Sequence, residues 1–370
     1  MPATPDTDAR WMRAALVLAS RGLGRVAPNP TVGCVLVADG HVIGRGWTQP
    51  GGRPHGERMA LDQAGPLARG ADAYVTLEPC AHYGKTPPCA DALIAAGVAR
   101  VICPLTDPDP RVAGRGFERL RAAGVAVSVG LMTEDAAAMN VGFFTRLRLG
   151  RPHLTLKLAA SLDGRIATGS GESQWISGPE ARAEAHLLRA RSDVILVGSG
   201  TAIADDPSLT VRLPGLEDRS PIPVILDSRA RTPLTTALVR GAPARGTILI
   251  HGPDAPPGRA DALRGAGVRC IAVPRGPDGR LSLAAALQAL GALGMTRAMC
   301  EGGGIIAAAL LSADLADELV WVSAGTLIGA EGLPGVGPLH LSRLADAPRF
   351  ERAESRPVGD DLLSRWVRRR

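Results

Sequence analysis

The sequence predicts an α/β protein of two domains, and three observations support this prediction. The chain has 370 residues, which is more than one average domain contains. Short apolar runs alternate with segments of helical periodicity, the pattern of helices that cover a largely parallel sheet. Near 145–153 ("TRLRLGRPH") this pattern breaks into Arg, Gly and Pro. We therefore expect a first domain over 1–146 and a second over 152–370.

The first half carries the signals of a helix, a hairpin and then alternating strands and helices. Residues 8–22 place Trp11, Leu18 and several alanines at helical spacing. Two strands are expected around an Asp39-Gly40 hairpin turn. The remaining expected elements are helices at 55–64, 88–96 and 114–123 and strands at 73–78, 100–105 and 125–129.

A second α/β run begins at 154–167 ("LTLKLAASLDGRIA"). Gly/Pro-rich connectors at 251–258 and 274–280 are typical of surface loops. No short-period repeat accompanies these segments. Strands are expected at 193–200, 223–228, 246–250, 298–303 and 317–325.

Composition limits the classes of function. The net charge is +6, but it comes from scattered arginines, and the single basic run, 368–370, is expected to be a solvated tail. Aromatic residues make up 3% of the chain, which argues against a stacking platform for single-stranded nucleic acid. No basic-then-apolar leader and no long apolar window is visible. We therefore expect a cytoplasmic protein without a membrane partner.

Cysteines in such a compartment stay reduced, so a disulfide is the less favoured interpretation of any cysteine pair. Four of the six cysteines lie in apolar, strand-like surroundings and are expected to be buried hydrophobic residues. They are Cys34, Cys103, Cys270 and Cys300.

The other two cysteines belong to "EPCAHYGKTPPC" (78–89), and upstream "PHGE" places His55 and Glu57 two residues apart. His55, Cys80 and Cys89 offer one imidazole and two thiolates, which suits a zinc site with a fourth position kept for water. Glu57 is not needed as a ligand and could carry a proton from that water to a leaving amine. This is the pattern of zinc deaminases, which combine His-x-Glu with two later cysteines.

Other interpretations remain open from the residues alone. A His-x-Glu pair is common on surface helices, and two reduced cysteines can be core residues. His82 is a competing imidazole inside the cysteine loop, and we expect it to meet substrate or solvent.

Three stretches together, "APNPTVGCVLVADGHVIGRGW", "GGRPHGE" and "EPCAHYGKTPPC", resemble the deaminase half of the bifunctional riboflavin-biosynthesis deaminase–reductase family. The resemblance implies a cytidine-deaminase-like fold, Zn²⁺ on His55, Cys80 and Cys89, and Glu57 as catalytic proton donor. Two positions depart from the family pattern. Gly56 replaces an alanine at a cost on the order of 1 kcal/mol of helix stability, and Thr48 stands where the family has histidine.

The second half lacks the Gly-x-Gly-x-x-Gly pattern of a dinucleotide-binding turn. Instead, "MCEGGGIIAAALLSADLADEL" (299–319) places three glycines between a strand and an apolar helix, where free backbone N–H groups suit a phosphate. A tight strand–helix turn is the alternative interpretation. With "LKLAASLDGRIA", "SGESQWISG", "DVILVGSGTAIADDPSLTVR" and "VILDSRAR", this segment resembles the reductase half of the same family. That resemblance implies a dihydrofolate-reductase-like fold and NADPH.

The family's site residues transfer by motif. Cofactor-binding positions would be Ala159, Trp175, Thr201, Asp205, Ser228, Gly303, Gly304, Ile305, Ile306, Ala307, Ala308 and Ala309. Substrate-binding positions would be Ser173, Arg189, Leu209, Arg212 and Glu301. Arg189 and Arg212 suit a ribose phosphate through forked hydrogen bonds.

Four further roles in this half are less specific. Trp175 suits packing on a nicotinamide ring. Asp205 is either the general acid or a cofactor-ribose contact, while Lys157 and Asp163 are expected to be structural.

The resulting hypothesis is a bifunctional enzyme acting on small phosphoribosylated pyrimidines. It would deaminate 2,5-diamino-6-(5-phosphoribosylamino)pyrimidin-4-one with zinc and then reduce the ribosyl chain to ribityl with NADPH. A homo-oligomer, dimer or tetramer, and no nucleic-acid partner are expected. The alternatives are a nucleic-acid base deaminase with an accessory domain, a non-catalytic zinc-stabilised binding protein, and an enzyme with one working half.

Overall fold

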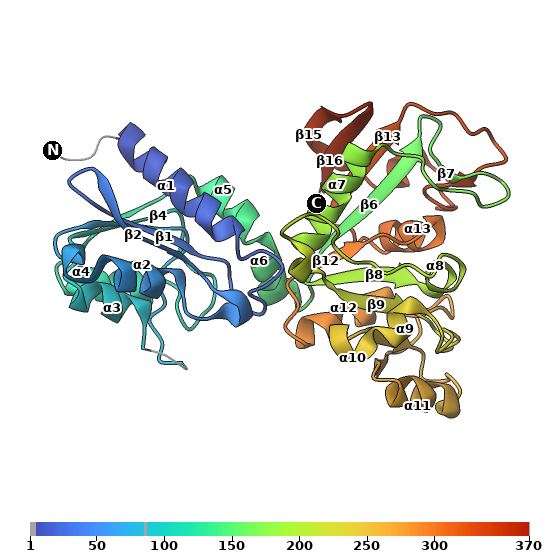
Figure 1. Ribbon diagram of the computed structural model, residues 1–370, viewed down its shortest axis with the longest axis horizontal. Helices are drawn as coiled ribbons and strands as arrows, with labels where there is room; N and C mark the ends of the chain where they lie inside the picture. The colour runs from blue at the N-terminus through green and yellow to red at the C-terminus, as the bar shows by residue number, and fades with distance from the viewer. Residues whose placement is uncertain (1–4, 85–86, 370) are drawn as a thin grey trace. The chain divides into compact units, whose positions relative to one another are not determined.

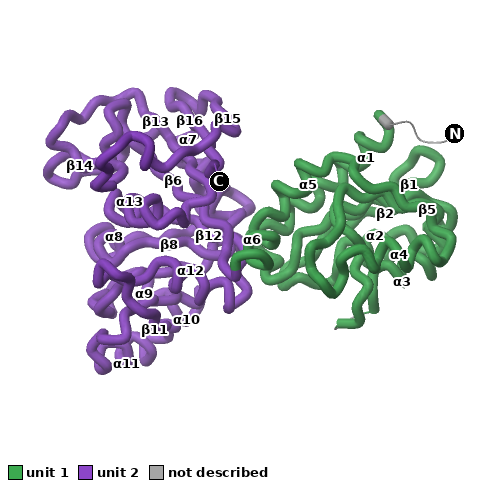
Figure 2. Tube along the Cα trace, turned by 180° about the vertical axis from the view of Figure 1, so that it is seen from behind, with its two compact units in different colours: residues 1–149 green, residues 150–370 purple. Residues whose placement is uncertain are grey.

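The computed structural model describes residues 5–84 and 87–369. It divides into two compact units, Met1–Leu149 and Gly150–Arg370, shown in different colours in Figure 2. Each unit is an α/β structure with its own sheet. Within the described ranges, no helix has the length and apolar character to cross a membrane.

The sheet of unit 1 has five strands in the order β2-β1-β3-β4-β5. They are β1 Gly33–Ala38, β2 His41–Trp47, β3 Asp72–Val75, β4 Arg100–Cys103 and β5 Ala126–Val129. The expected hairpin turn at Asp39-Gly40 is confirmed, because Ala38 pairs with His41 across it. Strand β1 is antiparallel to both of its neighbours, β2 and β3. The expectation of a largely parallel sheet is therefore wrong for this unit, since the two pairings of β1 are antiparallel and only β3-β4 and β4-β5 are parallel.

Helices cover both faces of this sheet (Figure 1). On one face, α1 packs its Met12 and Ala15 on Val35 and Tyr74. On the other face, α2 contributes Leu61 and α3 contributes Leu93 to a cluster around buried strand residues. The helices are α1 Pro5–Ser20, α2 Gly56–Ala64, α3 Cys89–Ala95, α4 Arg115–Ala122, α5 Thr133–Met139 and α6 Val141–Leu149. The sequence pattern did not predict α5 or α6.

A close approach between α2 and the hairpin explains the glycine at position 56. A side chain there would place its Cβ 2.7 Å from the carbonyl oxygen of Val32 and 3.2 Å from Cα of Trp47. The approach is equally close seen from the strand, because a Cβ at Gly46 would lie 2.3 Å from the carbonyl oxygen of Gly56. Because the backbones touch, the first turn of α2 can follow the strands directly, and the helix propensity lost at Gly56 is the cost of that contact.

Unit 2 is built on a nine-stranded sheet in the order β11-β10-β9-β8-β12-β6-β13-β16-β15. The pairings from β11 through to β13 are parallel, and β16 and β15 add antiparallel pairings at one edge. A largely parallel sheet is therefore confirmed for this unit. The strands are β6 His153–Ser161, β8 Val194–Gly198, β9 Ile222–Leu226, β10 Ile248–His251, β11 Arg269–Ala272, β12 Arg297–Cys300, β13 Glu318–Ala324, β15 Phe350–Val358 and β16 Asp361–Arg368.

Two apolar clusters fill the faces of the nine-stranded sheet, one around Leu156 and Leu196 and one around Ile195 and Ile225. Alternate residues of β8 thus serve opposite faces, as a strand buried on both sides requires. The helices are α7 Pro179–Ala190, α8 Ser199–Ala204, α9 Ala237–Arg240, α10 Ala242–Arg245, α11 Pro257–Gly265, α12 Leu283–Ala292 and α13 Gly304–Ser312, and a small pair is formed by β7 Arg165–Ala167 and β14 Leu333–Pro334.

The C-terminal segment corrects one expectation. Arg368, assigned to a solvated tail, ends strand β16, pairs its guanidinium with Asp314 at 2.6 Å and lies over the ring of Phe350. Arg369 is 70% exposed, and Arg370 lies outside the described residues. The pattern missed these strands because β15 alternates charged and small residues with little apolar content.

Candidate functional site

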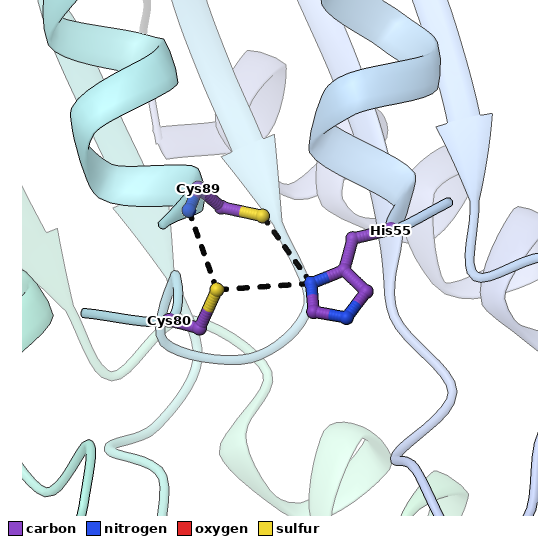
Figure 3. A group of neighbouring side chains, drawn as sticks. All are labelled: His55, Cys80 and Cys89. Atoms are coloured by element: carbon purple, nitrogen blue, oxygen red, sulfur yellow. Dashed lines mark hydrogen bonds between the residues drawn. The ribbon is translucent and has the colours of Figure 1, made fainter. Parts of the chain in front are cut away.

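The imidazole and the two thiols named from the sequence converge at one point of unit 1 (Figure 3). Their ligand atoms all lie within 4.8 Å of one another. Sγ of Cys80 lies 3.7 Å and Sγ of Cys89 3.3 Å from Nδ1 of His55. His82, the competing imidazole, is not part of this group. One nitrogen and two sulfurs form a donor set that fits zinc.

Three adjacent element ends place these side chains. His55 is the residue before α2, and Cys89 is the first residue of α3. Cys80 follows β3, and its sulfur accepts a hydrogen bond from the backbone N–H of Cys89 at 3.3 Å. A helix N-terminus favours a negative charge, so this arrangement stabilises a thiolate. All six cysteines are free of disulfides, as the sequence predicted for a reduced protein.

Glu57 occupies the first turn of α2 beside the ligand group. Its side chain is 3% exposed, and Oε2 finds no hydrogen-bond partner among the described residues. Burial raises the pKa of Glu57, against the nearby charge of His55. A buried carboxyl oxygen without a partner needs a ligand or a solvent molecule to satisfy it. Glu57 is therefore suited to exchange protons with a molecule bound next to His55.

The two thiols differ in their ionisation. Hydrogen bonding from Cys89 lowers the pKa of Cys80 to about 4, with a further lowering by His55. The same contact with Cys80, together with burial, raises the pKa of Cys89. The pair therefore keeps one proton between the two sulfurs, and a bound cation would release it.

A cavity of about 330 Å³ opens onto this group. His55, Glu57 and Cys80 line one side, and Asn29 and His82 line it as well. Its other charged lining residues are Arg53, Glu78, Asp107, Asp109, Arg111 and Arg146. The volume fits a small-molecule ligand, and His82, which is expected to meet substrate or solvent, is one of the residues that line the cavity.

Thr48 lines the same cavity, but its hydroxyl is engaged elsewhere. Oγ1 accepts the backbone N–H of Val32 at 3.0 Å, and the side chain is 1% exposed. Thr48 therefore ties the end of β2 to the segment before β1. A histidine-like contact with a ligand is not available from this hydroxyl while it holds that bond.

Glu78 is a residue that sequence reasoning missed. It lies immediately before Pro79-Cys80 and is 3% exposed. Its carboxylate accepts backbone N–H bonds from Asp107 at 3.0 Å and from Gly114 and Gly116 at 2.9 Å. It thus joins the cysteine segment to the loop that carries the acidic wall of the cavity. The signal available was an acidic residue at the end of a predicted buried strand.

A second cavity, of about 190 Å³, lies in unit 2. Four of the five predicted substrate residues line it, namely Ser173, Arg189, Arg212 and Glu301, together with the predicted cofactor residues Ala159 and Trp175. Leu209 is instead buried at 4% exposure outside the lining. Lys157, assigned a structural role from the sequence, also lines the cavity, where burial lowers its pKa against the charge of Glu301.

The remaining predicted cofactor residues follow the carboxyl ends of three neighbouring parallel strands. Thr201 and Asp205 follow β8, Ser228 follows β9, and the turn 303–309 follows β12. Such an edge is where parallel sheets bind nucleotides. Gly304 is required here because a Cβ would lie 2.4 Å from the carbonyl oxygen of Pro334.

The two acidic residues left open from the sequence take different positions. Asp205 is exposed and is not among the residues that line the second cavity. Asp163 accepts N–H bonds from Ile328 at 3.2 Å and from Gly329 at 2.7 Å, so it anchors a loop.

Family models match both units of the chain. The model of the RibD C-terminal domain matches residues 152–364, and that of the cytidine and deoxycytidylate deaminase zinc-binding region matches residues 5–105. Riboflavin biosynthesis protein RibD of Escherichia coli K12 is 45% identical over 97% of this chain and 99% of its own length. The protein of the same name from Aquifex aeolicus is 39% identical over 97% and 98%.

Solved structures agree with these matches. Acinetobacter baumannii RibD, form 1, has a TM-score of 0.88 and 37% identity over 99% of this chain and 100% of its own. A Thermotoga maritima protein described as diaminohydroxyphosphoribosylaminopyrimidine deaminase/5-amino-6-(5-phosphoribosylamino)uracil reductase has a TM-score of 0.86 and 32% identity, with 99% of each chain covered. The similarity thus spans both units.

Proposed function

The chain belongs to the RibD family and is a bifunctional deaminase–reductase of riboflavin biosynthesis, and we propose that residues 1–146 carry the deamination and residues 152–370 the reduction. The first reaction hydrolyses an amino group from 2,5-diamino-6-(5-phosphoribosylamino)pyrimidin-4-one. The second reduces the ribosyl chain of the product to ribityl with NADPH. A nucleic-acid base deaminase is not favoured, because the similarity to RibD proteins covers both units.

The deaminase reaction is assigned to the cavity of unit 1. His55, Cys80 and Cys89 would hold Zn²⁺, whose fit rests on their convergent nitrogen and sulfur atoms. When bound, the metal supplies a Lewis acid that acidifies water. Glu57 accepts a proton at its unpartnered Oε2 and delivers it to the leaving amine. The walls of the cavity bind and orient the pyrimidine and its phosphoribosyl group.

The reductase reaction is assigned to the cavity of unit 2. When bound, NADPH supplies the hydride. We assign the cofactor contacts to the turn 303–309 and to the smaller set Ala159, Trp175, Thr201, Asp205 and Ser228. Ser173, Arg189, Leu209, Arg212 and Glu301 are assigned to the substrate. Leu209 acts here through its backbone or through packing, because its side chain is buried outside the cavity.

The convergence of the three ligands beside a buried, unpartnered glutamate is the observation that carries the deaminase assignment. The test is metal analysis of the purified protein, with ammonia release and NADPH oxidation measured in parallel. We expect one zinc per chain in the wild type. Cys89→Ser should lose zinc and ammonia release but still oxidise NADPH with the deaminated substrate. Ammonia release that persists without zinc would overturn the assignment.

We also infer a cytoplasmic homo-oligomer, a dimer or tetramer, that acts on free small molecules and not on nucleic acid. Six unpaired cysteines support a reducing compartment. The exposed Leu362 and Val367 of β16 support self-association. Light scattering on the purified protein, with and without RNA, tests both points.

A further inference from the structure

The guanidinium of Arg189, which is expected to bind a phosphate, forms hydrogen bonds with protein groups in the second cavity. Nε and Nη2 donate to the two oxygens of Glu301 at 2.7 and 2.8 Å, and Nη1 donates to the carbonyl oxygen of Thr210 at 2.9 Å. The side chains of Arg189 and Glu301 are 13% and 14% exposed. All three nitrogens of the guanidinium therefore already donate hydrogen bonds, two of them in a forked ion pair. This leaves Arg189 few donors with which to bind a phosphate.

Among the other lining residues, one arginine is also hydrogen-bonded, and one lysine lies near an opposite charge. Arg182 donates from Nη1 to the carbonyl oxygen of Ser177 at 2.6 Å and lies over the ring of Trp175. Lys157 faces the charge of Glu301. Arg212 differs, since its guanidinium has only a 3.4 Å contact with Oγ of Ser208. Arg212 is therefore the arginine in this cavity best placed to bind an anion.

His186 of α7 lies beside Arg212 and lines the same cavity. The backbone N–H of Arg212 donates to Nδ1 of His186 at 3.2 Å. An amide can only donate, so Nδ1 accepts and the proton of the neutral ring is on Nε2. Burial and the charges of Arg189 and Arg212 lower the pKa of His186, against Glu301 and the carbonyl of Thr210. The lowered pKa favours the neutral ring, and that ring carries its proton on Nε2 because Nδ1 accepts.

The segment that carries Arg212 is also held from its other side. Arg245 donates from Nη2 to the carbonyl oxygens of Leu209 at 3.2 Å and of Pro221 at 3.0 Å. Oγ of Ser220 accepts the N–H of Val211 at 2.9 Å. Since these bonds do not involve His186, a change at position 186 should leave the segment in place.

We propose that His186 binds the phosphate group of the reductase substrate, with its Nε2–H donating to a phosphate oxygen next to Arg212 while Nδ1 orients the Arg212 backbone. This inference rests on the proposed reductase function of the same cavity. It adds His186 to Arg212 at the phosphate, and Arg189 keeps its assignment to the substrate through its pairing with Glu301. Arg189 then serves to fix Glu301 against the rest of the substrate.

The test compares two substitutions that each keep one half of the imidazole. His186→Asn keeps an acceptor near Nδ1 but removes the Nε2 donor, whereas His186→Gln places an amide N–H near the Nε2 position. For the phosphorylated substrate we expect KM to rise roughly 10-fold in His186→Asn and less than about 3-fold in His186→Gln. His340→Asn, a change at an exposed histidine of the same unit, is the matched control and should leave KM unchanged.

A second comparison uses a ligand without the phosphate, so that the effect of the substitution on each ligand can be separated. The competitive inhibition constant of the dephosphorylated substrate should be the same in wild type and His186→Asn, because the lost contact is to the phosphate. Equal weakening of both ligands, or no change in KM, would overturn the proposal. The KM for NADPH and the release of ammonia by unit 1 report that the chain is folded. A wild type that fails to oxidise NADPH with the deaminated substrate would instead contradict the proposed function.

Discussion

The two cavities of this enzyme satisfy their polar groups in opposite ways. In unit 1, the contact between the two thiols lowers the pKa of Cys80 and raises that of Cys89, and an oxygen of Glu57 lacks a partner among the described residues. In unit 2, Arg189 and Glu301 neutralise each other through two hydrogen bonds. The first site is thus complete only with a ligand, whereas the second is already paired before substrate and cofactor enter.

This difference follows from what each site binds. A metal ion is a concentrated charge that must replace protons on its ligands, so a ligand group suited to it combines ionisable sulfurs with a nearby unsatisfied atom. A dinucleotide and a sugar phosphate spread their charge over many atoms and are held by backbone turns and a few cations. Disturbing one residue should consequently abolish the first activity but only weaken the second.

The largest effect is expected at Glu57. Glu57→Gln keeps the size of the side chain but cannot take up a proton, so ammonia release should fall by roughly 10³-fold or more. Zinc content should remain at the wild-type level, because the ligands are His55, Cys80 and Cys89. Assays of ammonia release and bound metal on one preparation check both statements.

The reductase activity of the same preparation is the control for Glu57→Gln. NADPH oxidation with the deaminated substrate should be unchanged, since Glu57 belongs to the other unit. Loss of zinc in the variant would mean that Glu57 is a metal ligand. The carboxylate would then not be the unpartnered group that distinguishes unit 1 from unit 2.

Glu78 tests whether a buried carboxylate that holds backbone N–H groups matters as much for deamination as Glu57 does. In Glu78→Gln an amide would face backbone N–H groups that now donate to a carboxylate. A clash of donors in a buried position costs about 2–4 kcal/mol. We expect a lower urea midpoint for unit 1 and a loss of ammonia release, with NADPH oxidation retained. A variant with wild-type deaminase activity would show that the loop at 107–117 keeps its position without Glu78.

Arg212→Ala probes the distributed binding in unit 2. Loss of one cation at the phosphate should raise the KM for the deaminated substrate by roughly 10- to 100-fold, with a smaller effect on the KM for NADPH. The comparison of the two constants by steady-state kinetics is the measurement. An equal rise in the two KM values would mean that Arg212 supports the shape of the cavity and does not bind the phosphate.

The sequence predicted the unit 1 site better than the unit 2 site for the same physical reason. His55, Cys80 and Cys89 are rare residue types at motif spacing, and they meet because each lies at the end of an element that the pattern identified. The fork of Arg189 is harder to assign from the sequence, since arginine suits both a phosphate and a carboxylate, and only tertiary contacts decide between them. Glu78 and His186 act through backbone groups of distant loops, which leave no trace in sequence periodicity.

Fold prediction failed at comparable places. Strand β1 lies between two antiparallel neighbours because the hairpin folds back at the sheet edge, which alternating helices and strands do not reveal. Helices α5 and α6 follow each other with little amphipathic contrast. Strand β15 carries charged residues on its exposed edge, a composition that prevents edge pairing in solution but hides the strand from an apolar pattern.

The smallest expected effect concerns stability in unit 2 and uses a buried histidine outside both cavities. His153 begins β6, is 8% exposed, and has a buried Nδ1 without a partner among the described residues. Burial lowers its pKa from 6.5 to about 4. The folded state therefore keeps a neutral ring while the unfolded state takes up a proton below pH 6.5. The resulting stability is present above pH 6.5 and is lost as the pH falls toward 4.

Between pH 6.5 and pH 5 this linkage should lower the free energy of unfolding by about 2 kcal/mol. His153→Gln, which is close in size and does not titrate, should lack this contribution. Urea unfolding of wild type and variant at both pH values isolates it, because all other groups titrate alike in the two proteins. Parallel pH profiles would mean that the pKa of His153 is the same in the folded and unfolded chain, so that burial does not depress it.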